Sequence, residues 1–470
     1  MKLENFPEWY TDVILRSELA DYGPVKGTMV IRPYGYALWE RVQQIFDAMI
    51  KADGVQNAYF PMFIPEHLLK KEKEHVEGFA PEVAVVTHAG GKKLTEPLIV
   101  RPTSEAIMYE MFAKWIHSWR DLPFMINQWT NAVRWELRTY LFLRTSEFLW
   151  QEGHTVHAEH EEAERQVMRA LDHYVALYQE YFGIAGIAGK KSPAERFAGA
   201  DETYTYEMLM PDGKALQGCT SHDLGQNFSK AFHIEFQGKD GATHLPWQTS
   251  WGLSTRSIGG LIMAHGDDQG LVLPPRLAPV QLVVIPIYKG KEMPEDIAKT
   301  IALIREALEG EVRLHVDGRT EYTPGWKFHE WELKGVPLRL EIGQKECASR
   351  QATLVRRDTK ETVRVELGEI RNAVPDLLRS IQRNLFDASS AFLREHTREV
   401  ATYDAFKSVM SEHKGFLRAF WCEDSACEAR IKEETKATTR CLPLDAPEEK
   451  GECVYCAKPA KHRWIFAQAY

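Results

Sequence analysis

Two consecutive segments with alternating side chains constrain the fold of this chain most strongly. Residues 130–143, TNAVRWELRTYLFL, place charged side chains at every second position, namely Arg134, Glu136 and Arg138. Residues 144–157, RTSEFLWQEGHTVH, likewise alternate, with Phe148, Trp150, Glu152 and His154 in phase. Because successive side chains of a strand point to opposite faces, this spacing predicts two adjacent β-strands that share one aromatic and charged face.

That shared face has two interpretations. Alternation is usually the mark of a solvated strand face. Aromatic rings beside paired charges suit a different purpose, because arginine pairs with anions and rings stack on flat groups. We therefore favour a floor that binds an anionic ligand with a flat ring.

The length of 470 residues predicts several domains. For residues 1–273 we expect an α+β domain, an antiparallel sheet flanked by helices, with helices from Pro33, after residue 104 and over 161–182, and strands near 55–63, 83–88, 97–102, 203–209, 230–236 and 244–252. The segment LPPRLAP (273–279) predicts a boundary, since closely spaced prolines end regular structure. An α/β domain over 274–383 and a small α+β domain over 384–470 are expected to follow.

Charge and cysteine content narrow the function classes. The net charge of −9 argues against binding nucleic acid through bulk charge, although a local basic face is compatible with it. The sequence shows neither a long apolar stretch nor a signal peptide, so we expect a cytoplasmic protein that does not span a membrane. Five of the seven cysteines fall in the last fifty residues, which in a cytosolic chain indicates a metal site more often than disulfides.

Three further segments carry candidate site residues. RPTSEAI contains Thr103 and Glu105, QGCTSHDLGQNF contains Gln217, Thr220 and His222, and SWGLSTRSIGG contains Ser254 and Arg256. Each segment has an ordinary explanation when taken alone, respectively helix capping, a structural histidine and a helix N-cap. Their combination with the charged strand pair is far more specific than any one of them.

In this combination the chain resembles the class II aminoacyl-tRNA synthetases, and among them the prolyl-tRNA synthetases of the archaeal and eukaryotic type. The segments that carry the resemblance are MVIRPYGYALWERV, VRWELRTYLFLRTSEFLWQEGHT and WGLSTRSIGGLIMAHGDDQGLVLPPR, and PTSE and TSHDLGQNF match the proline-specific members. The resemblance implies a ligase that activates L-proline with ATP to prolyl-adenylate and transfers the prolyl group to the 3′ end of tRNA(Pro).

The resemblance also implies roles for single residues. Arg134 and Arg256 would be the catalytic cations, with Arg134 contacting both the α-phosphate and the proline carboxylate. ATP would be held by Arg134, Glu136, Arg144, Thr145, Phe148, Gln217, Thr220, Ser254 and Arg256. Proline would be held by Thr103, Glu105, Arg134, Trp150, Glu152, His154, Phe197 and His222. Mg²⁺ would accompany ATP by bridging phosphate oxygens.

Two further expectations follow from the resemblance. The helix from Pro33 would pack at the interface of a homodimer. Residues 274–383 would bind the anticodon, where side chains able to read guanine edges and phosphates are Arg339, Glu341, Lys345 and Arg350. A solvated strand face explains any one of these four residues equally well.

The last domain carries a cysteine pattern that indicates zinc. Cys422 and Cys427 are spaced C-x₄-C, and Cys453 and Cys456 are spaced C-x₂-C. Four thiolates complete a tetrahedral shell and leave no position for a substrate, so we expect a structural Zn²⁺ site. Cys441 lies between the pairs and is either a spare thiol or a replacement for one of the four.

The chain ends in RWIFAQAY, an unusually apolar terminus. Its bulky side chains would be unfavourable in water, so we expect a docked tail, with a disordered end as the alternative. Rival functions for the whole chain are a catalytically silent relative that binds tRNA, an enzyme of this fold that adenylates another small acid, and, least favoured, a zinc-dependent enzyme. Intact candidate residues argue against the first rival and the anticodon-type domain against the second.

Overall fold

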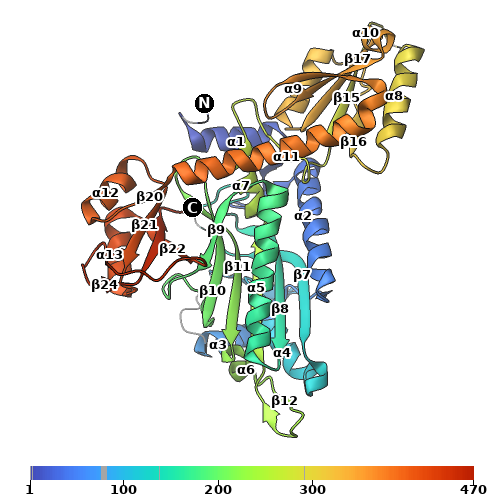
Figure 1. The fold of residues 1–470 in the computed structure, drawn as a ribbon. Helices are drawn as coiled ribbons and strands as arrows, with labels where there is room; N and C mark the ends of the chain where they lie inside the picture. The colour runs from blue at the N-terminus through green and yellow to red at the C-terminus, as the bar shows by residue number, and fades with distance from the viewer. Residues whose placement is uncertain (1, 3, 76–81, 137, 291) are drawn as a thin grey trace.

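The computed structural model describes residues 2, 4–75, 82–136, 138–290 and 292–470, and its three parts are distinct in Figure 1. The elements of the first part are α1 (Phe6–Arg16), β1 (Ala20–Tyr22), β2 (Met29–Ile31), α2 (Pro33–Ala52), β3 (Gln56–Asn57), β4 (Phe63–Pro65), α3 (Glu66–His75), β5 (Ala84–Ala89), β6 (Lys92–Val100), α4 (Glu105–Trp115), β7 (Phe124–Val133), β8 (Glu147–His157), α5 (His160–Ala176), β9 (Gly186–Lys190), β10 (Glu202–Leu209), β11 (Ala215–Gly225), α6 (Asn227–Phe232), β12 (Phe236–Gln237), β13 (Thr243–His244), β14 (Trp247–Ser254) and α7 (Arg256–His265).

The central sheet of this part is antiparallel, as predicted. Its strand order is β9-β10-β11-β14-β8-β7-β3, and only the short β3 pairs in parallel with its neighbour among the described strands. Helix α5 lies across one face of the sheet (Figure 1). There Phe46 of α2 stacks on Tyr174 of α5 with ring centroids 4.8 Å apart, and the Trp251 ring lies edge-on to both. The opposite face of the sheet is therefore left for a ligand.

Gly153 of β8 is required by the packing beneath this sheet. A Cβ atom at this position would lie 2.2 Å from Cζ2 of Trp251 on the adjacent strand. A larger residue would displace the indole of Trp251 and push strands β8 and β14 apart. Gly153 thus permits the close packing that holds the side chains of β8 in position on the opposite face of the sheet.

Two strand predictions in this part were wrong, and one strand was not predicted. The strand expected over 130–143 ends at Val133, because Trp135 N donates to Glu82 O (2.9 Å) and the chain leaves the ladder; Leu137 lies outside the described residues. The strand expected over 230–236 begins inside helix α6, which ends at Phe232, and only Phe236 belongs to a strand. Residues 215–225, which contain the candidate His222, form the central strand β11.

The second part is the predicted α/β domain. Its elements are β15 (Leu282–Ile287), α8 (Glu295–Leu308), β16 (Leu314–Val316), α9 (Pro324–Leu333), β17 (Leu338–Gly343), α10 (Gln344–Ser349), β18 (Gln351–Arg356), β19 (Thr362–Glu366) and α11 (Ile370–Glu395). The sheet order is β16-β15-β17-β18-β19, with parallel pairing around β15 and antiparallel pairing beyond β17. Helix α11 passes without a break through the expected boundary at residue 383, and its buried side chains before that point pack into this domain.

The third part continues the central sheet of the first part. Its elements are β20 (Thr397–Glu399), α12 (Tyr403–Glu412), β21 (Phe416–Trp421), α13 (Ser425–Thr435), β22 (Thr438–Pro443), β23 (Gly451–Glu452), β24 (Pro459–Ala460) and β25 (His462–Ala467). Strand β22 pairs with β9, with Leu442 opposite Lys190, so that one sheet runs through both parts. Hydrogen bonds of the backbone therefore connect the cysteine-rich third part to the first part.

A buried ion cluster reinforces this junction. Glu207 of β10 accepts from Lys191 Nζ (2.8 Å) and from Arg440 Nη2 of β22 (2.8 Å), and all three side chains are almost inaccessible to solvent. Burial alone would raise the pKa of Glu207, but Arg440 and Lys191 lower it to about 2. Removal of one member would leave an uncompensated buried charge, which typically costs about 3–5 kcal/mol.

The chain terminus is docked, as expected. Ala215 N donates to Gln468 O (2.8 Å), and Tyr470 N donates to Ala215 O (3.2 Å). The Tyr470 side chain packs against the core of the catalytic domain, with Lys214 Nζ 4.7 Å from its ring centroid. The last residues thus add a bridge to β11, the strand that carries His222.

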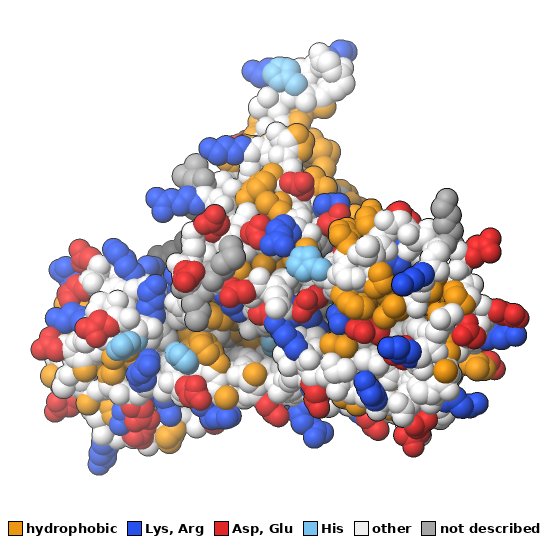
Figure 2. All heavy atoms as spheres, turned by 90° about the horizontal axis from the view of Figure 1, so that it is seen from above, with side chains coloured by type: hydrophobic (Ala, Val, Ile, Leu, Met, Phe, Trp, Pro, Cys, Tyr) orange, Lys and Arg blue, Asp and Glu red, His pale blue; other side chains and the backbone are white. Residues whose placement is uncertain are grey.

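The surface agrees with the mixed charge of the sequence. Figure 2 shows basic and acidic side chains interspersed over the face of the molecule seen from above. Within the described ranges, no helix is long and apolar enough to cross a membrane.

Candidate active site

A cavity of about 340 Å³ opens on the face of the central sheet that points away from α5. Every residue assigned above to the catalytic site lines it: Thr103, Glu105, Arg134, Glu136, Arg144, Thr145, Phe148, Trp150, Glu152, His154, Phe197, Gln217, Thr220, His222, Ser254 and Arg256. These residues come from widely separated segments, and the strand register brings them together.

Strand β14 lies between the two strands that carry the histidines. Its Ser250 is opposite His154 of β8 on one side and opposite His222 of β11 on the other. Ser254 is opposite Trp150. Since side chains two residues apart share a face, β8, β11 and β14 present one continuous floor.

Two buried carboxylates form one end of the cavity. Glu105 begins α4 and accepts from the Thr103 hydroxyl. Glu152 accepts from the Ser104 hydroxyl and from Gln128 Nε2 (2.9 Å). Ser104 occupies the N-cap of α4 but makes no capping bond with its side chain, so the capping interpretation of this segment was wrong.

The ionisation of this acidic end depends on its burial. Burial raises the pKa of the Glu105 carboxyl; His154 acts in the opposite sense and Glu152 adds to the rise. A carboxylate in this state is stabilised strongly by a cationic ligand, because the ligand replaces the solvation that the protein has removed. The acidic end is therefore suited to an ammonium group.

A neutral histidine and aromatic rings lie beside the carboxylates. His222 Nδ1 is 2.9 Å from the Thr203 hydroxyl, and its ring centroid is 4.6 Å from that of Phe197. Burial, with a contribution from His154, lowers the pKa of His222 to about 3, so the ring is uncharged at neutral pH. This wall can contact a small apolar ring without adding charge.

Two arginines define the other end. Arg134 Nε donates to Pro102 O (3.1 Å), and Arg256 Nε donates to Leu143 O (3.0 Å). The Arg134 guanidinium lies 5.4 Å from the Phe148 ring centroid and 5.7 Å from that of Trp150. Since each guanidinium is aimed through its Nε, its terminal nitrogens remain well placed for an anion.

Both arginines stay cationic although the cavity is deep. Burial lowers the pKa of Arg134, while Glu105, Glu152 and Glu136 oppose the change. Burial and then the neighbouring Arg134 and Arg144 lower the pKa of Arg256 to about 10. Two close positive charges that repel each other provide a strong site for a phosphate or carboxylate.

Sequence reasoning missed several lining residues, namely Phe142, Leu143, Glu195, Thr203, Gly218, Cys219, Ser250, Trp251, Gly252 and Leu253. Thr203 is the most informative, because it lies directly opposite His222 in the β10–β11 ladder. The alternation of side chains around residue 203 was the only signal in the sequence that Thr203 faces the cavity. It could not show that Thr203 pairs with His222. Ser250 could have been found from the sequence, because it lies four residues before Ser254 and therefore on the same face of the strand.

Three family models match successive parts of the chain. The model described as the class II core domain of the Gly, His, Pro, Ser and Thr tRNA synthetases matches residues 88–265, an anticodon-binding domain matches 281–377, and the C-terminal domain of prolyl-tRNA synthetase matches 403–470. Proline–tRNA ligase 2 of Clostridioides difficile is 51% identical over 99% of this chain and 97% of its own length. The corresponding values for a proline–tRNA ligase of Acetoanaerobium sticklandii are 52%, 99% and 97%.

The chain belongs to the prolyl-tRNA synthetase family.

Solved structures of this family share the fold. The prolyl-tRNA synthetase of Cryptosporidium parvum in complex with halofuginone and AMPPNP has a TM-score of 0.95 and 43% identity, covering 100% of this chain and 98% of that one. The same enzyme with L-proline and AMP gives 0.94 and 42%, covering 100% and 96%. The chain is thus a class II ligase of the proline–tRNA type, as the sequence predicted.

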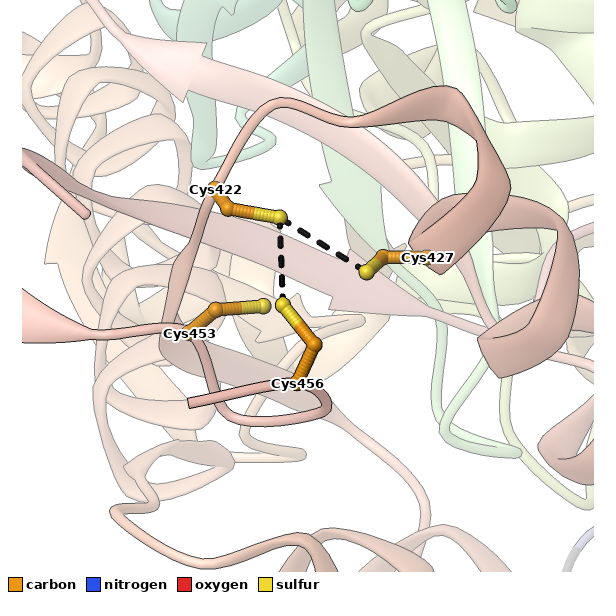
Figure 3. Close-up of side chains that lie close together, drawn as sticks. All are labelled: Cys422, Cys427, Cys453 and Cys456. Carbon is orange, nitrogen blue, oxygen red and sulfur yellow. Dashed lines mark hydrogen bonds between the residues drawn. The ribbon is translucent and has the colours of Figure 1, made fainter. Parts of the chain in front are cut away.

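The C-terminal domain of this synthetase family member carries the cysteine cluster. The sulfurs of Cys422, Cys427, Cys453 and Cys456 all lie within 4.8 Å of one another and point toward a common centre (Figure 3). Cys422 Sγ is 3.6 Å from both Cys427 Sγ and Cys456 Sγ. Four sulfurs so arranged fit a tetrahedral metal such as zinc. Cys441 is buried in β22 against Gly189 and does not belong to the cluster. It therefore does not replace one of the four cysteines.

In the anticodon-type domain, two of the four candidate residues line a cavity and two do not. Arg339 and Glu341 line a cavity of about 460 Å³, in which Arg339 Nε donates to Glu341 Oε1 (3.0 Å). The Arg339 guanidinium lies 4.2 Å from the Phe328 ring centroid. Lys345 lies in α10 and Arg350 at its C-cap, and neither lines that cavity.

Proposed function

We propose that the cavity of about 340 Å³ is the site where L-proline and ATP form prolyl-adenylate, and where the prolyl group passes to the terminal adenosine of tRNA(Pro). The observation that carries this assignment is the polarity of one cavity. Buried carboxylates and a neutral histidine lie at one end, and two fixed guanidiniums lie at the other.

Proline fits the acidic end. Its secondary ammonium would pair with Glu105, held in place by Thr103, while Glu152 and His154 complete the polar wall. Its ring would contact Trp150, Phe197 and His222. The proline carboxylate would then point along the floor toward Arg134.

ATP fits the cationic end. The adenine would stack between Phe148 and Arg256, with Glu136, Arg144, Thr145, Gln217, Thr220 and Ser254 holding the nucleotide. Mg²⁺ bound together with ATP would supply charge neutralisation at the phosphates. Arg134 would contact the α-phosphate.

The reaction requires two anions to meet. A carboxylate oxygen of proline attacks the α-phosphorus, the bond to pyrophosphate breaks, and negative charge accumulates on the α-phosphate oxygens. Arg134 would neutralise both partners, because its charge interacts with Glu105 and Glu152 at the acidic end and also with Arg256. In the second step a ribose hydroxyl of tRNA attacks the prolyl carbonyl, and AMP departs.

Pyrophosphate exchange across a panel of amino acids tests the assignment. Exchange that depends on proline is expected. Exchange driven by another small acid alone would favour a different adenylating enzyme of this fold, and no exchange with intact tRNA binding would favour a silent relative.

The pKa of Glu105 predicts a pH dependence of proline binding. The carboxyl must be ionised to pair with the ammonium, and burial raises its pKa in the free enzyme. As the pH falls through that raised value, KM for proline should increase, by about tenfold per pH unit at the limit. Glu105→Gln should raise KM at every pH and abolish this dependence, which steady-state exchange at several pH values measures. An unchanged pH profile in the variant would contradict the assignment.

A second prediction separates anticodon reading from activation. We propose that the cavity around Arg339 and Glu341 contacts the anticodon, because a guanidinium beside an aromatic ring can stack on and pair with a base. Arg339→Ala should lower kcat/KM for tRNA charging roughly 5- to 150-fold and leave proline-dependent exchange intact. Arg305→Ala, which removes an exposed guanidinium of α8 that does not line the cavity, serves as the matched control. Equal losses in both assays would refute the separation.

The remaining assignments concern assembly. We propose that Cys422, Cys427, Cys453 and Cys456 hold a structural Zn²⁺, which requires a compartment that keeps thiols reduced, such as the cytoplasm. We propose a homodimer through α2, near which the apolar side chains of Val30 and Tyr36 remain exposed. We also propose domains over 1–273, 274–383 and 384–470, with α11 connecting the last two.

A further inference from the structure

The loop over residues 191–201 connects β9 to β10 and forms part of the cavity wall. It contributes Glu195 and Phe197 to the lining. Phe197 N donates to the Thr203 hydroxyl (3.1 Å), which in turn contacts His222 Nδ1 (2.9 Å). The distal part of the loop is thus fixed to the end of the cavity assigned to proline.

The first part of the same loop is held by the C-terminal domain. The Ser192 hydroxyl donates to Glu428 Oε1 of α13 (2.8 Å), and the Thr439 hydroxyl of β22 lies within hydrogen-bonding distance of both. The side chains of these three residues are buried. Ser192 also turns the loop, because Glu195 N lies 3.1 Å from its carbonyl and 3.3 Å from its hydroxyl.

A second side chain of α13 reaches the same segment. Lys432, one helical turn after Glu428, places Nζ 3.6 Å from Glu195 Oε1. Lys432 is exposed and Glu195 is half-buried, so this pair contributes little by itself. It nevertheless shows that one face of α13 lies along the loop that carries Glu195 and Phe197.

The burial of the Glu428 carboxylate costs desolvation energy that a packing contact alone would not explain. Its Oε2 is buried and makes no hydrogen bond to the described residues. An apolar side chain would avoid the cost of desolvating a carboxylate, so the acceptor must serve the two hydroxyls that converge on Oε1.

We propose that Glu428 is a positioning residue for proline recognition. Through Ser192 it fixes the turn at Glu195, and thereby the height of Phe197 against His222. The C-terminal domain would contribute in this way to the specificity pocket without touching the substrate. The inference rests on the proposed binding of proline in this cavity.

Glu428→Ala in the full-length chain tests the role. We expect the KM for proline in exchange, and the Kd for proline by calorimetry, to rise about tenfold, since misplacement of a wall residue weakens a close-fitting site. The KM for ATP, the metal content and the kcat should stay unchanged. Glu428→Gln retains the Oε1 acceptor and should restore a KM for proline near that of the natural chain.

Two further variants make the outcome decisive. Glu433→Ala, on α13 but paired only with Arg430 across 3.1 Å among the described residues, is the matched control and should change nothing. Ser192→Ala breaks the same link from the other side and should reproduce the rise in KM even if Glu428→Ala folds poorly. An unchanged KM for proline in Ser192→Ala, or an equal rise in the KM for ATP, would overturn the proposal. A natural chain that shows no proline-dependent exchange would instead overturn the proposed function.

Discussion

Arg134→Ala is expected to lower kcat for proline-dependent pyrophosphate exchange by roughly 10²–10³-fold or more, the loss seen when one preorganised donor is removed from a developing charge. The charge of Arg134 interacts with Glu105 and Glu152 of the acidic end and with Arg256, and its Nε bond to Pro102 O fixes its direction. In the proposed reaction this guanidinium contacts both the proline carboxylate and the α-phosphate, so its removal should affect the chemical step directly.

The same substitution should leave the fold intact. The guanidinium contacts the Phe148 and Trp150 rings from the cavity side and does not belong to the hydrophobic core. Far-ultraviolet circular dichroism and the thermal transition should therefore match those of the natural chain. Arg134→Lys should recover little, because an ammonium cannot reproduce the fork geometry of guanidinium.

Arg138→Ala is the matched control for Arg134→Ala. It removes the same charge four residues later, from an exposed side chain that does not line the cavity. We expect it to retain exchange activity. Comparable losses in the two variants would indicate a general effect of charge and contradict the specific role of Arg134.

Cys453→Ser should have the largest effect on stability. If the four sulfurs hold Zn²⁺, the metal supplies apparent binding energy of about 10–16 kcal/mol to a small domain, and the loss of one ligand removes much of it. We expect the variant to contain no zinc by atomic emission, and its C-terminal domain to become susceptible to limited proteolysis.

The damage should extend to the catalytic domain. Three contacts join the two domains: β22 pairs with β9, Arg440 neutralises Glu207, and the tail hydrogen-bonds to Ala215. Unfolding of the C-terminal domain would break all three. A drop in proline-dependent exchange should accompany the loss of metal. Cys441→Ala, which alters a buried cysteine outside the cluster, should retain zinc; loss of zinc in Cys441→Ala, or its retention in Cys453→Ser, would refute the assigned ligand set.

The two segments with alternating side chains show how far local reasoning reached. For β8 the prediction was confirmed, because Trp150, Glu152 and His154 are paired with strands on both sides, and Phe148 is paired with β7. For Arg134 and Glu136 the residues were correctly placed at the cavity although the strand was wrong. Tyr140 and Arg144 close a turn instead, with Leu141, Phe142 and Leu143 buried in the core, so the apolar run LFL was drawn inward.

The segment 230–236 failed for a related reason. Its apolar residues are compatible with a strand and equally with a short helix. Packing against the rest of the domain decided between the two. In α6, Phe228 and Phe232 both pack into the core that contains Tyr109 of α4. Short apolar segments carry too few residues for periodicity to distinguish the two cases.

The sequence by itself determined the residue types of the site, the cysteine spacing and the apolar terminus, because these depend on neighbours within a few positions of the chain. Only the tertiary structure decided that Thr203 supports His222, that Cys441 stands apart from the other cysteines, and that Glu428 reaches Ser192. Each of these contacts joins residues from different elements, and its existence depends on strand register and domain docking. Register and docking are set by the burial of whole faces, which no single segment of the sequence specifies.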